Sequence, residues 1–185
     1  MITSEFNGVP LKFQTLPGLF SPKALDAGTK AMLSCAQFRP EDKVLDLGCG
    51  YGFVGIYAAK LVGGRNVTMI DADKWAVAIS RKNARLNNVP DIRIFQSDGF
   101  GNIDDAGYTL ILSNPPYQSD FSVAKHFIEK GFNRLAIGGK LIMVTKRRDW
   151  YKNKIISVFG GVIIKEIDGY FVFTAERRTL NYSTK

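Results

Sequence analysis

The tetrapeptide Asn114-Pro115-Pro116-Tyr117 is the sharpest chemical signal in the sequence. Its two prolines fix their own φ angles and push the residue before each of them towards extended backbone, which makes the segment a rigid shelf. Asn114 offers a side-chain carbonyl, Pro115 offers a backbone carbonyl without an N–H, and Tyr117 offers a planar face. Such a shelf can accept hydrogen bonds from a planar amino group, although a strand-ending Pro-Pro turn without chemistry would look the same in isolation.

An aromatic amino group needs a site of this kind before its nitrogen can attack an electrophile. The lone pair of the amino group on a nucleobase is delocalised into the ring, so the nitrogen is a poor nucleophile. Two acceptors on its two N–H groups favour a more pyramidal, electron-rich nitrogen, and a stacked ring holds it in line. Orientation of this kind contributes up to about 7–11 kcal/mol. The proton leaves after transfer, so we expect His126, the only histidine, to be an ordinary helix residue.

A second motif, Asp46-Leu47-Gly48-Cys49-Gly50-Tyr51-Gly52, joins a predicted strand to a predicted helix. Glycines at alternate positions let the backbone turn tightly and approach a ligand closely, as nucleotide-binding loops do. Loops that cradle a pyrophosphate normally have an apolar residue in place of Asp46, and no Gly-Lys-Ser/Thr of a P-loop follows. An acid favours a cationic ligand, and S-adenosylmethionine carries an ammonium and a sulfonium but no phosphate. We therefore expect S-adenosylmethionine as the cofactor, with its carboxylate at the helix N-terminus.

Two more acids end the next two predicted strands. Asp71 lies 19 residues after Gly52, a distance at which a carboxylate can accept hydrogen bonds from ribose hydroxyls. Asp98 can accept from an adenine amino group, or can equally be a solvated loop acid. The expected cofactor site comprises Asp46, Gly48, Cys49, Gly50, Gly52, Asp71, Ala72, Asp98, Gly99, Asn114 and Thr29.

The elements that must position these residues alternate between apolar strands and amphipathic helices. The predicted strands are Val44–Leu47, Asn66–Ile70, Ile92–Gln96, Tyr108–Ser113, Lys140–Thr145, Val162–Ile167 and Tyr170–Ala175. The predicted helices are Ala24–Gln37, Phe53–Leu61, Lys74–Leu86 (capped by Asp73), Ser122–Ala136 (ended by Gly138-Gly139) and Asn153–Phe159. This alternation predicts an α/β fold with a mainly parallel sheet and helices on both faces. Ligands bind beyond the carboxyl ends of such strands.

The two ends of the sequence depart from this alternation. Residues 1–22 read as an extended lead-in. Asp168-Gly169 is a strong hairpin signal, which places one antiparallel strand in the sheet. The 185 residues suit a single domain, with residues 1–40 as lead-in and helix and residues 41–178 as the catalytic core.

Composition narrows the class of protein further. No stretch approaches the ~20 apolar residues that span a bilayer, and the first residues do not resemble a secretion signal. Cys35 and Cys49 form no CxxC pair, so we expect a cytoplasmic protein without a metal site or a disulfide. The oligomeric state, monomer or homodimer, stays open.

The net charge of +8 favours a polyanionic partner, of which nucleic acid is the commonest. Lys146, Arg147 and Arg148 are followed closely by Trp150 and Tyr151. Basic residues interleaved with aromatic ones suit a surface that neutralises phosphates and stacks on bases, whereas a solvated face is the plainer interpretation. We expect these three basic residues and the Tyr117 ring to contact an RNA substrate.

These motifs resemble the class I S-adenosylmethionine-dependent methyltransferases that act on planar amino groups, whose hallmark is (Asn/Asp)-Pro-Pro-(Tyr/Phe). Two segments, Pro17-Gly18-Leu19-Phe20-Ser21 and Leu25-Asp26-Ala27-Gly28-Thr29, look like the small-domain ribosomal RNA guanine-N2 methyltransferases, and Asn83 and Asn87 also fit that group. The resemblance covers nearly the whole chain. It implies a Rossmann-like, seven-stranded sheet with a reversed last strand.

The resemblance also implies roles for the motif residues. It implies that the base is held by Asn114 to Tyr117 and that the cofactor is held by Asp46, Gly48, Gly50, Asp71 and Asp98. Bacterial members of the ribosomal group carry an additional N-terminal domain, so this sequence is more similar to single-domain versions.

We therefore expect methyl transfer to guanine N2 in ribosomal or transfer RNA. Adenine N6 in RNA or DNA is the main alternative, because the motif serves both amino groups. A protein glutamine amide, which the basic charge disfavours, and a non-catalytic RNA-binding module, which the intact motifs disfavour, are the remaining alternatives.

Overall fold

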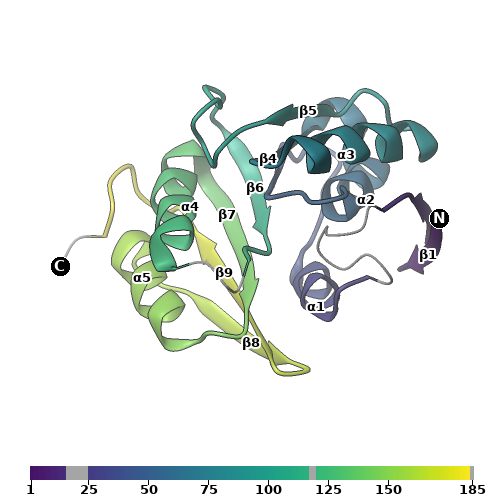
Figure 1. The fold of residues 1–185 in the computed structure, drawn as a ribbon. Helices are drawn as coiled ribbons and strands as arrows, with labels where there is room; N and C mark the ends of the chain where they lie inside the picture. The colour runs from purple at the N-terminus through teal and green to yellow at the C-terminus, as the bar shows by residue number, and fades with distance from the viewer. Residues whose placement is uncertain (16–24, 117–119, 184–185) are drawn as a thin grey trace.

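A seven-stranded sheet forms the centre of the computed structural model, which describes residues 1–15, 25–116 and 120–183 (Figure 1). Its strand order is β5-β4-β3-β6-β7-β9-β8. Neighbouring strands are parallel except β9, which runs antiparallel to both β7 and β8. The strands are β3 (Val44–Leu47), β4 (Val67–Asp71), β5 (Arg93–Gln96), β6 (Tyr108–Ser113), β7 (Leu135–Thr145), β8 (Ile163–Ile167) and β9 (Tyr170–Glu176). The predicted mainly parallel sheet with an antiparallel last strand is confirmed.

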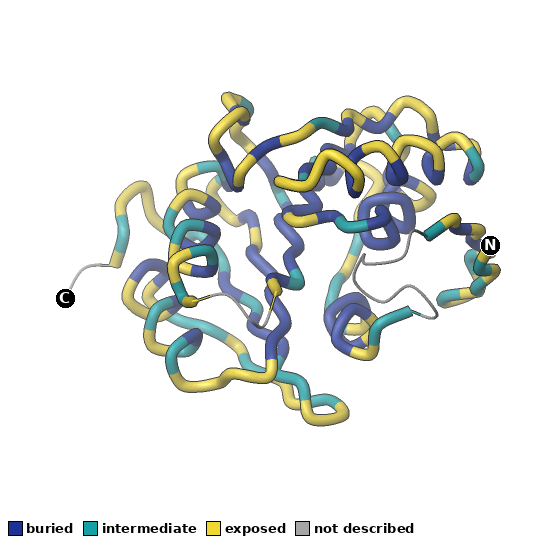
Figure 2. Tube along the Cα trace, viewed as in Figure 1, coloured by how far each residue is buried: buried dark blue, intermediate teal, exposed yellow. Residues whose placement is uncertain are grey.

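Helices cover both faces of this sheet, as predicted (Figure 1). The alternation of side chains along β6 shows why: Leu110 and Leu112 belong to one buried cluster and Ile111 to the other. Figure 2 shows the central strands buried and the outer helix surfaces exposed. The first cluster lies under α1 (Ala27–Cys35), α2 (Phe53–Val62) and α3 (Lys74–Leu86), and the second lies under α4 (Phe121–Arg134) and α5 (Asp149–Phe159). A single 3-10 turn, η1 (Gly64–Asn66), precedes β4.

The predicted end of the helix after β6 is wrong. Gly138-Gly139 does not end α4, which stops at Arg134, but lies inside β7. Between its pairings with β6, β7 advances from Leu135 to Lys140 while β6 advances only from Tyr108 to Leu110. The extra residues form a bulge that hydrogen bonds to Arg177 hold on the β9 side, at 2.7 and 2.8 Å. Glycine serves there because Gly138 has a φ of 82°.

The lead-in is extended in most of residues 1–15, as expected, but the pairing of its two strands was not predicted. β1 (Ile2–Phe6) and β2 (Val9–Phe13) pair as an antiparallel hairpin around Asn7 and Gly8. Both turn residues have positive φ, 49° and 77°, the geometry of a type I′ turn. The remaining lead-in, including Pro17-Gly18-Leu19-Phe20-Ser21, lies outside the described residues.

Two buried asparagines, Asn83 of α3 and its C-cap residue Asn87, attach this hairpin to the core. Asn87 exchanges two hydrogen bonds with the backbone of Lys12, and Asn83 exchanges two with the backbone of Gln14. The spacings match, because four helical residues and two strand residues each span about 6–7 Å. Asn83 also donates to the carbonyl of Tyr51 at 2.8 Å. The family-like asparagines therefore tie the N-terminal hairpin to the glycine loop.

Candidate functional site

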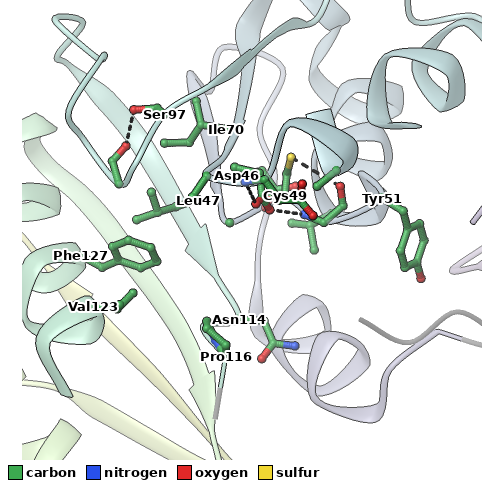
Figure 3. Close-up of a pocket in the computed structure, with 18 of the residues that line it drawn as sticks. Asp46, Leu47, Cys49, Tyr51, Ile70, Ser97, Asn114, Pro116, Val123 and Phe127 are labelled. Atoms are coloured by element: carbon green, nitrogen blue, oxygen red, sulfur yellow. Dashed lines mark hydrogen bonds between the residues drawn. The ribbon is translucent and has the colours of Figure 1, made fainter. Parts of the chain in front are cut away.

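The carboxyl ends of β3, β4, β5 and β6 border a cavity of about 390 Å³. Figure 3 shows Val123 and Phe127 of α4 on one side of it, Asp46 and Cys49 on another, and Asn114 with Pro116 at one end. The cavity brings together ten residues of the predicted cofactor site: Thr29, Asp46, Gly48, Cys49, Gly50, Asp71, Ala72, Asp98, Gly99 and Asn114. Their roles toward a cofactor stay predictions.

The glycine loop owes its path to positive φ angles at its alternate glycines. Gly48, Gly50 and Gly52 have φ of 78°, 55° and 98°, values that residues with a Cβ rarely adopt. Gly52 differs from the other two glycines, because it does not line the cavity and is the N-cap residue of α2. A Cβ there would lie 2.8 Å from Met69 Cε. The φ of 98°, together with the packing against Met69 of β4, therefore favours glycine at this position.

Asp46 has a structural partner that the sequence did not reveal. Its carboxylate accepts a hydrogen bond from the backbone N–H of Gly55 at 2.8 Å, in the first turn of α2. The N-cap residue Gly52 has no side chain to do this, so Asp46 replaces a capping side chain. Only 3% of Asp46 is exposed, and this burial raises the pKa of the carboxyl to about 7 although the Gly55 N–H opposes the shift. A cation beside Asp46 would favour its ionised form.

Asp71 links the glycine loop to the start of α3. One carboxylate oxygen accepts from Gly50 N at 2.8 Å and the other accepts from Asp73 N at 2.9 Å. Each oxygen keeps a second lone pair, so an additional donor such as a hydroxyl can still bind. Asp73 itself caps α3 through Trp75 N, as predicted.

The loop after β5 holds Asp98 and Gly99 against the cavity. Ser97 Oγ donates to Gly99 O at 2.7 Å, and Phe100 N donates to His126 Nε2 at 3.2 Å. His126 therefore lies on α4, as expected, and shapes the loop by accepting a backbone N–H. Ser97 was not predicted as a site residue, and the hydrogen bonds of its side chain are made within its own loop.

The predicted base-binding motif begins at Asn114, which directly follows β6 and lies next to the N-terminus of α1. Asn114 Nδ2 donates to Asp26 Oδ2 at 2.9 Å and to Thr29 Oγ1 at 3.1 Å. Pro115 is buried and Pro116 lines the cavity, whereas Tyr117 lies outside the described residues. Asp26 was not predicted as a site residue, and its local signal is its position as the N-cap residue of α1.

The predicted basic cluster, Lys146–Arg148, follows β7 and is exposed, but it does not line the cavity. The Arg147 guanidinium lies 5.0 Å from the Phe121 ring centroid. That ring stacks on Trp150, with centroids 4.3 Å apart. The cluster and its aromatic neighbours thus lie at the carboxyl edge of the sheet, on the α4–α5 side.

The described residues offer neither a cluster of metal ligands nor a membrane-spanning helix. Within residues 1–15, 25–116 and 120–183, no group of three or more His, Cys, Asp or Glu could hold a metal ion. None of the helices described there is long and apolar enough to cross a membrane. Cys35 and Cys49 are both free thiols.

The raised pKa of Asp46 predicts a pH-dependent stability. The folded carboxyl binds a proton up to about pH 7, whereas an unfolded one releases it near pH 3.9. Asp46 therefore makes the free energy of unfolding fall as pH rises between about 4 and 7. Asp46→Asn keeps an oxygen for Gly55 N and removes the titration. Urea unfolding at pH 5, 6, 7 and 8 should show the variant gaining stability relative to wild type at each step up to pH 7. Parallel curves would contradict the burial argument.

Comparisons with known proteins agree with this geometry. Residues 10–174 match the model of the methyltransferase small domain. An uncharacterized protein of Bacillus subtilis, YbxB, is 32% identical over 171 residues, which are 89% of this chain and 85% of that protein. Ribosomal RNA small subunit methyltransferase C of Pseudomonas putida W619 is 32% identical over 180 residues, 94% of this chain and 53% of that protein.

A solved structure extends the likeness to three dimensions. The 16S rRNA N2 G1207 methyltransferase of T. thermophilus, in complex with AdoMet and guanosine, matches with a TM-score of 0.83 at 26% identity, over 96% of this chain and 50% of that one. The chain spans about half the length of the curated ribosomal RNA methyltransferases that it matches. On the match of its residues 10–174, this chain belongs to the methyltransferase small domain family.

Proposed function

We propose that this chain transfers a methyl group from S-adenosylmethionine to the exocyclic N2 of a guanine in RNA. Small-subunit ribosomal RNA is the proposed substrate, and transfer RNA is the alternative. The observation that carries the proposal is the position of Asn114, which borders the same cavity as the glycine loop. A base amine on the Asn114 shelf and a cofactor on the loop would therefore share one enclosed space.

The cavity fits S-adenosylmethionine as the cofactor. A Cβ built on Gly48 or Gly50 would meet nothing within 4 Å, so the space beside the loop can take a ligand. In our proposal Asp46 holds the ammonium side of the cofactor, Asp71 the ribose and Asp98 the adenine amino group. When bound, the cofactor supplies a methyl group on a positively charged sulfonium.

The residues of the chain prepare the amine. Asp26 and Thr29 accept hydrogen bonds from the Asn114 nitrogen, which turns the amide oxygen away from them and toward an incoming N–H. The backbone carbonyl of Pro115 is the proposed second acceptor. The amine then keeps more of its lone pair on nitrogen, and its proton leaves to water after the methyl group has been gained. Val123 and Phe127 give the cavity an apolar wall that excludes water during transfer.

The choice of guanine and of ribosomal RNA rests on the relatives. Several curated relatives are named ribosomal RNA small subunit methyltransferase C, and the T. thermophilus structure is a complex with both AdoMet and guanosine. TrmN from Thermus thermophilus has 24% identity and a TM-score of 0.68, a likeness that concerns the fold alone. Adenine N6 is the competing base that an experiment must separate.

Two further predictions, on the compartment and on the division of the chain, accompany the proposal. The free thiols of Cys35 and Cys49 suit a reducing compartment, so we propose a cytoplasmic reaction. We also keep the proposed division into an N-terminal lead-in and helix, residues 1–40, and a catalytic core, residues 41–178, within one domain. The monomer and the homodimer both remain open as assembly states.

The first test concerns Asn114. Asn114→Ala should lower the single-turnover rate of methyl transfer by about 100-fold or more, in the range seen when one transition-state hydrogen bond is lost. RNA affinity should stay nearly unchanged, because the bond matters most in the transition state. Tyr117→Phe should retain most activity, since we assign the ring face to function. Mass spectrometry of wild-type product should show N2-methylguanosine, whereas methyl on adenine, ribose or a ring carbon would refute the proposal.

The second test concerns the basic cluster. Changing Lys146, Arg147 and Arg148 together to Gln should weaken RNA binding and flatten its salt dependence. Each lost phosphate contact should reduce the slope of log affinity against log salt by roughly 0.7 to 0.9. The same change at three exposed basic residues of α2 and α3, Lys60, Lys82 and Arg85, removes equal charge and serves as the control. Equal slopes for the two triple variants would show that Lys146–Arg148 is only a solvated face.

A further inference from the structure

Asp26 connects the N-terminus of α1 to the base shelf, and its two carboxylate oxygens have different surroundings. Oδ2 accepts from Thr29 N at 2.8 Å, Thr29 Oγ1 at 3.3 Å and Asn114 Nδ2 at 2.9 Å. Oδ1 accepts no hydrogen bond from any residue within the described ranges. Because Asp26 is a cavity-lining residue, it brings a carboxylate oxygen with unused acceptor capacity to the edge of the base site.

These contacts determine which hydrogen-bonding groups a base would meet. The Asn114 amide nitrogen is directed at Asp26 and Thr29, so its carbonyl oxygen points away from these two residues, and in the proposed function this oxygen faces the base. The prolines that follow have no N–H, and the Thr29 hydroxyl is within hydrogen-bond distance of Asp26 Oδ2. The described groups around Asp26 and Asn114 therefore offer hydrogen-bond acceptors to a base, while their donors are directed at other protein groups.

A site lined with hydrogen-bond acceptors distinguishes the nucleobases by the ring nitrogen next to the carbon that bears the amine. In guanine this atom is N1–H, so N1 and N2 together present three adjacent donors. In adenine and cytosine it is an unprotonated ring nitrogen, whose lone pair would face the carboxylate. A site whose groups match one pattern of donors and acceptors strongly rejects an analogue with a different pattern, because buried polar groups are then left unpaired.

We infer that Asp26 is a specificity-determining residue that selects guanine. Its Oδ2 holds the Asn114 amide in the accepting orientation, and its Oδ1 accepts N1–H of the target guanine. The carboxylate also stabilises the positive charge that the guanine carries after the N2–CH3 bond has formed and the S–CH3 bond has broken, until the N2 proton leaves to water. This inference rests on the proposed function, since it assumes that a base amine occupies the Asn114 shelf.

A pair of nucleosides isolates the N1 contact. Guanosine and 2-aminopurine riboside carry the same amine at C2, but N1 is a donor in the first and an acceptor in the second. Calorimetry on the chain saturated with S-adenosylhomocysteine should give wild type a preference for guanosine of about tenfold or more. The missing O6 of 2-aminopurine affects every variant equally, so the change in preference between variants reports N1.

Asp26→Asn is the decisive variant. It keeps an oxygen for Thr29 N and for Asn114 Nδ2, while it puts an NH2 donor in the place of Oδ1. The preference for guanosine should fall to about equal binding or reverse. Asp26→Ser, which still caps α1 but is too short for Asn114, should lose the preference and also lower the rate. Asp120→Asn, the same change at the N-cap of α4 outside the cavity lining, should keep the wild-type preference.

The outcomes separate the inference from the proposed function. If Asp26→Asn keeps the wild-type preference, or if wild type shows none, the inference is overturned even when RNA assays yield N2-methylguanosine. If wild-type chain methylates adenine in RNA, the proposed function itself fails, whatever the nucleosides show. Loss of preference in Asp26→Asn, with unchanged S-adenosylhomocysteine affinity, supports the inference.

Discussion

The hydrogen bond from Gly55 N to the buried carboxylate of Asp46 is the interaction on which the site depends. It joins the end of β3 to the first turn of α2, so the glycine loop between them is held at both ends. Gly48 N and Cys49 N, which both donate to Ile70 O at 2.9 Å, fix the middle of that loop against β4. The glycine-loop side of the cavity is thus held by backbone hydrogen bonds and by the carboxylates of Asp46 and Asp71, which leaves room for a ligand.

The same acid couples stability to binding. A carboxyl with a pKa of about 7 and 3% exposure is costly to ionise where it lies. A cation beside Asp46 offsets that cost, because an opposite charge favours the ionised form. An aspartate that caps a helix and also faces a cavity is therefore well suited to a cationic cofactor. It is poorly suited to a pyrophosphate, whose charge would repel it.

The base side of the cavity depends on a long-range contact. Asn114 directly follows β6, and its partners Asp26 and Thr29 are the N-cap residue and a first-turn residue of α1, 88 and 85 residues earlier in the chain. The helix that we predicted as part of the lead-in therefore contributes directly to the cavity. The amide of Asn114 is oriented before any base arrives, which is the kind of preorganisation that orientation-driven catalysis requires.

Local signals predicted most of the sheet and its helices. α3, capped by Asp73, and β6 agree residue for residue with the predictions, because their periodicity and caps are local. The turn at Asp168-Gly169 was predicted from its dipeptide, whereas the equivalent signal at Asn7-Gly8 was overlooked between two short strands. No local pattern could reveal the bulge in β7, since its register depends on β6.

Long-range partners explain the remaining gaps in the predicted site. The motif residues were predicted from their types and spacing, and the parallel sheet brings the carboxyl ends of their strands to one edge. The link from Asp46 to the Gly55 amide and the anchoring of Asn114 by Asp26 depend on three-dimensional proximity. The end of α4 was misjudged for the same reason, because Gly138 and Gly139 look like a helix stop in isolation.

A crystal structure with S-adenosylhomocysteine and guanosine bound would test most directly that one cavity holds both cofactor and base. Our account predicts the cofactor along the glycine loop, with its amino group near Asp46. It predicts the guanine with N2 within hydrogen-bond distance of Asn114 Oδ1 and N1 facing Asp26. A cofactor bound elsewhere, or a guanine whose C2 amine points away from Asn114, would contradict the account.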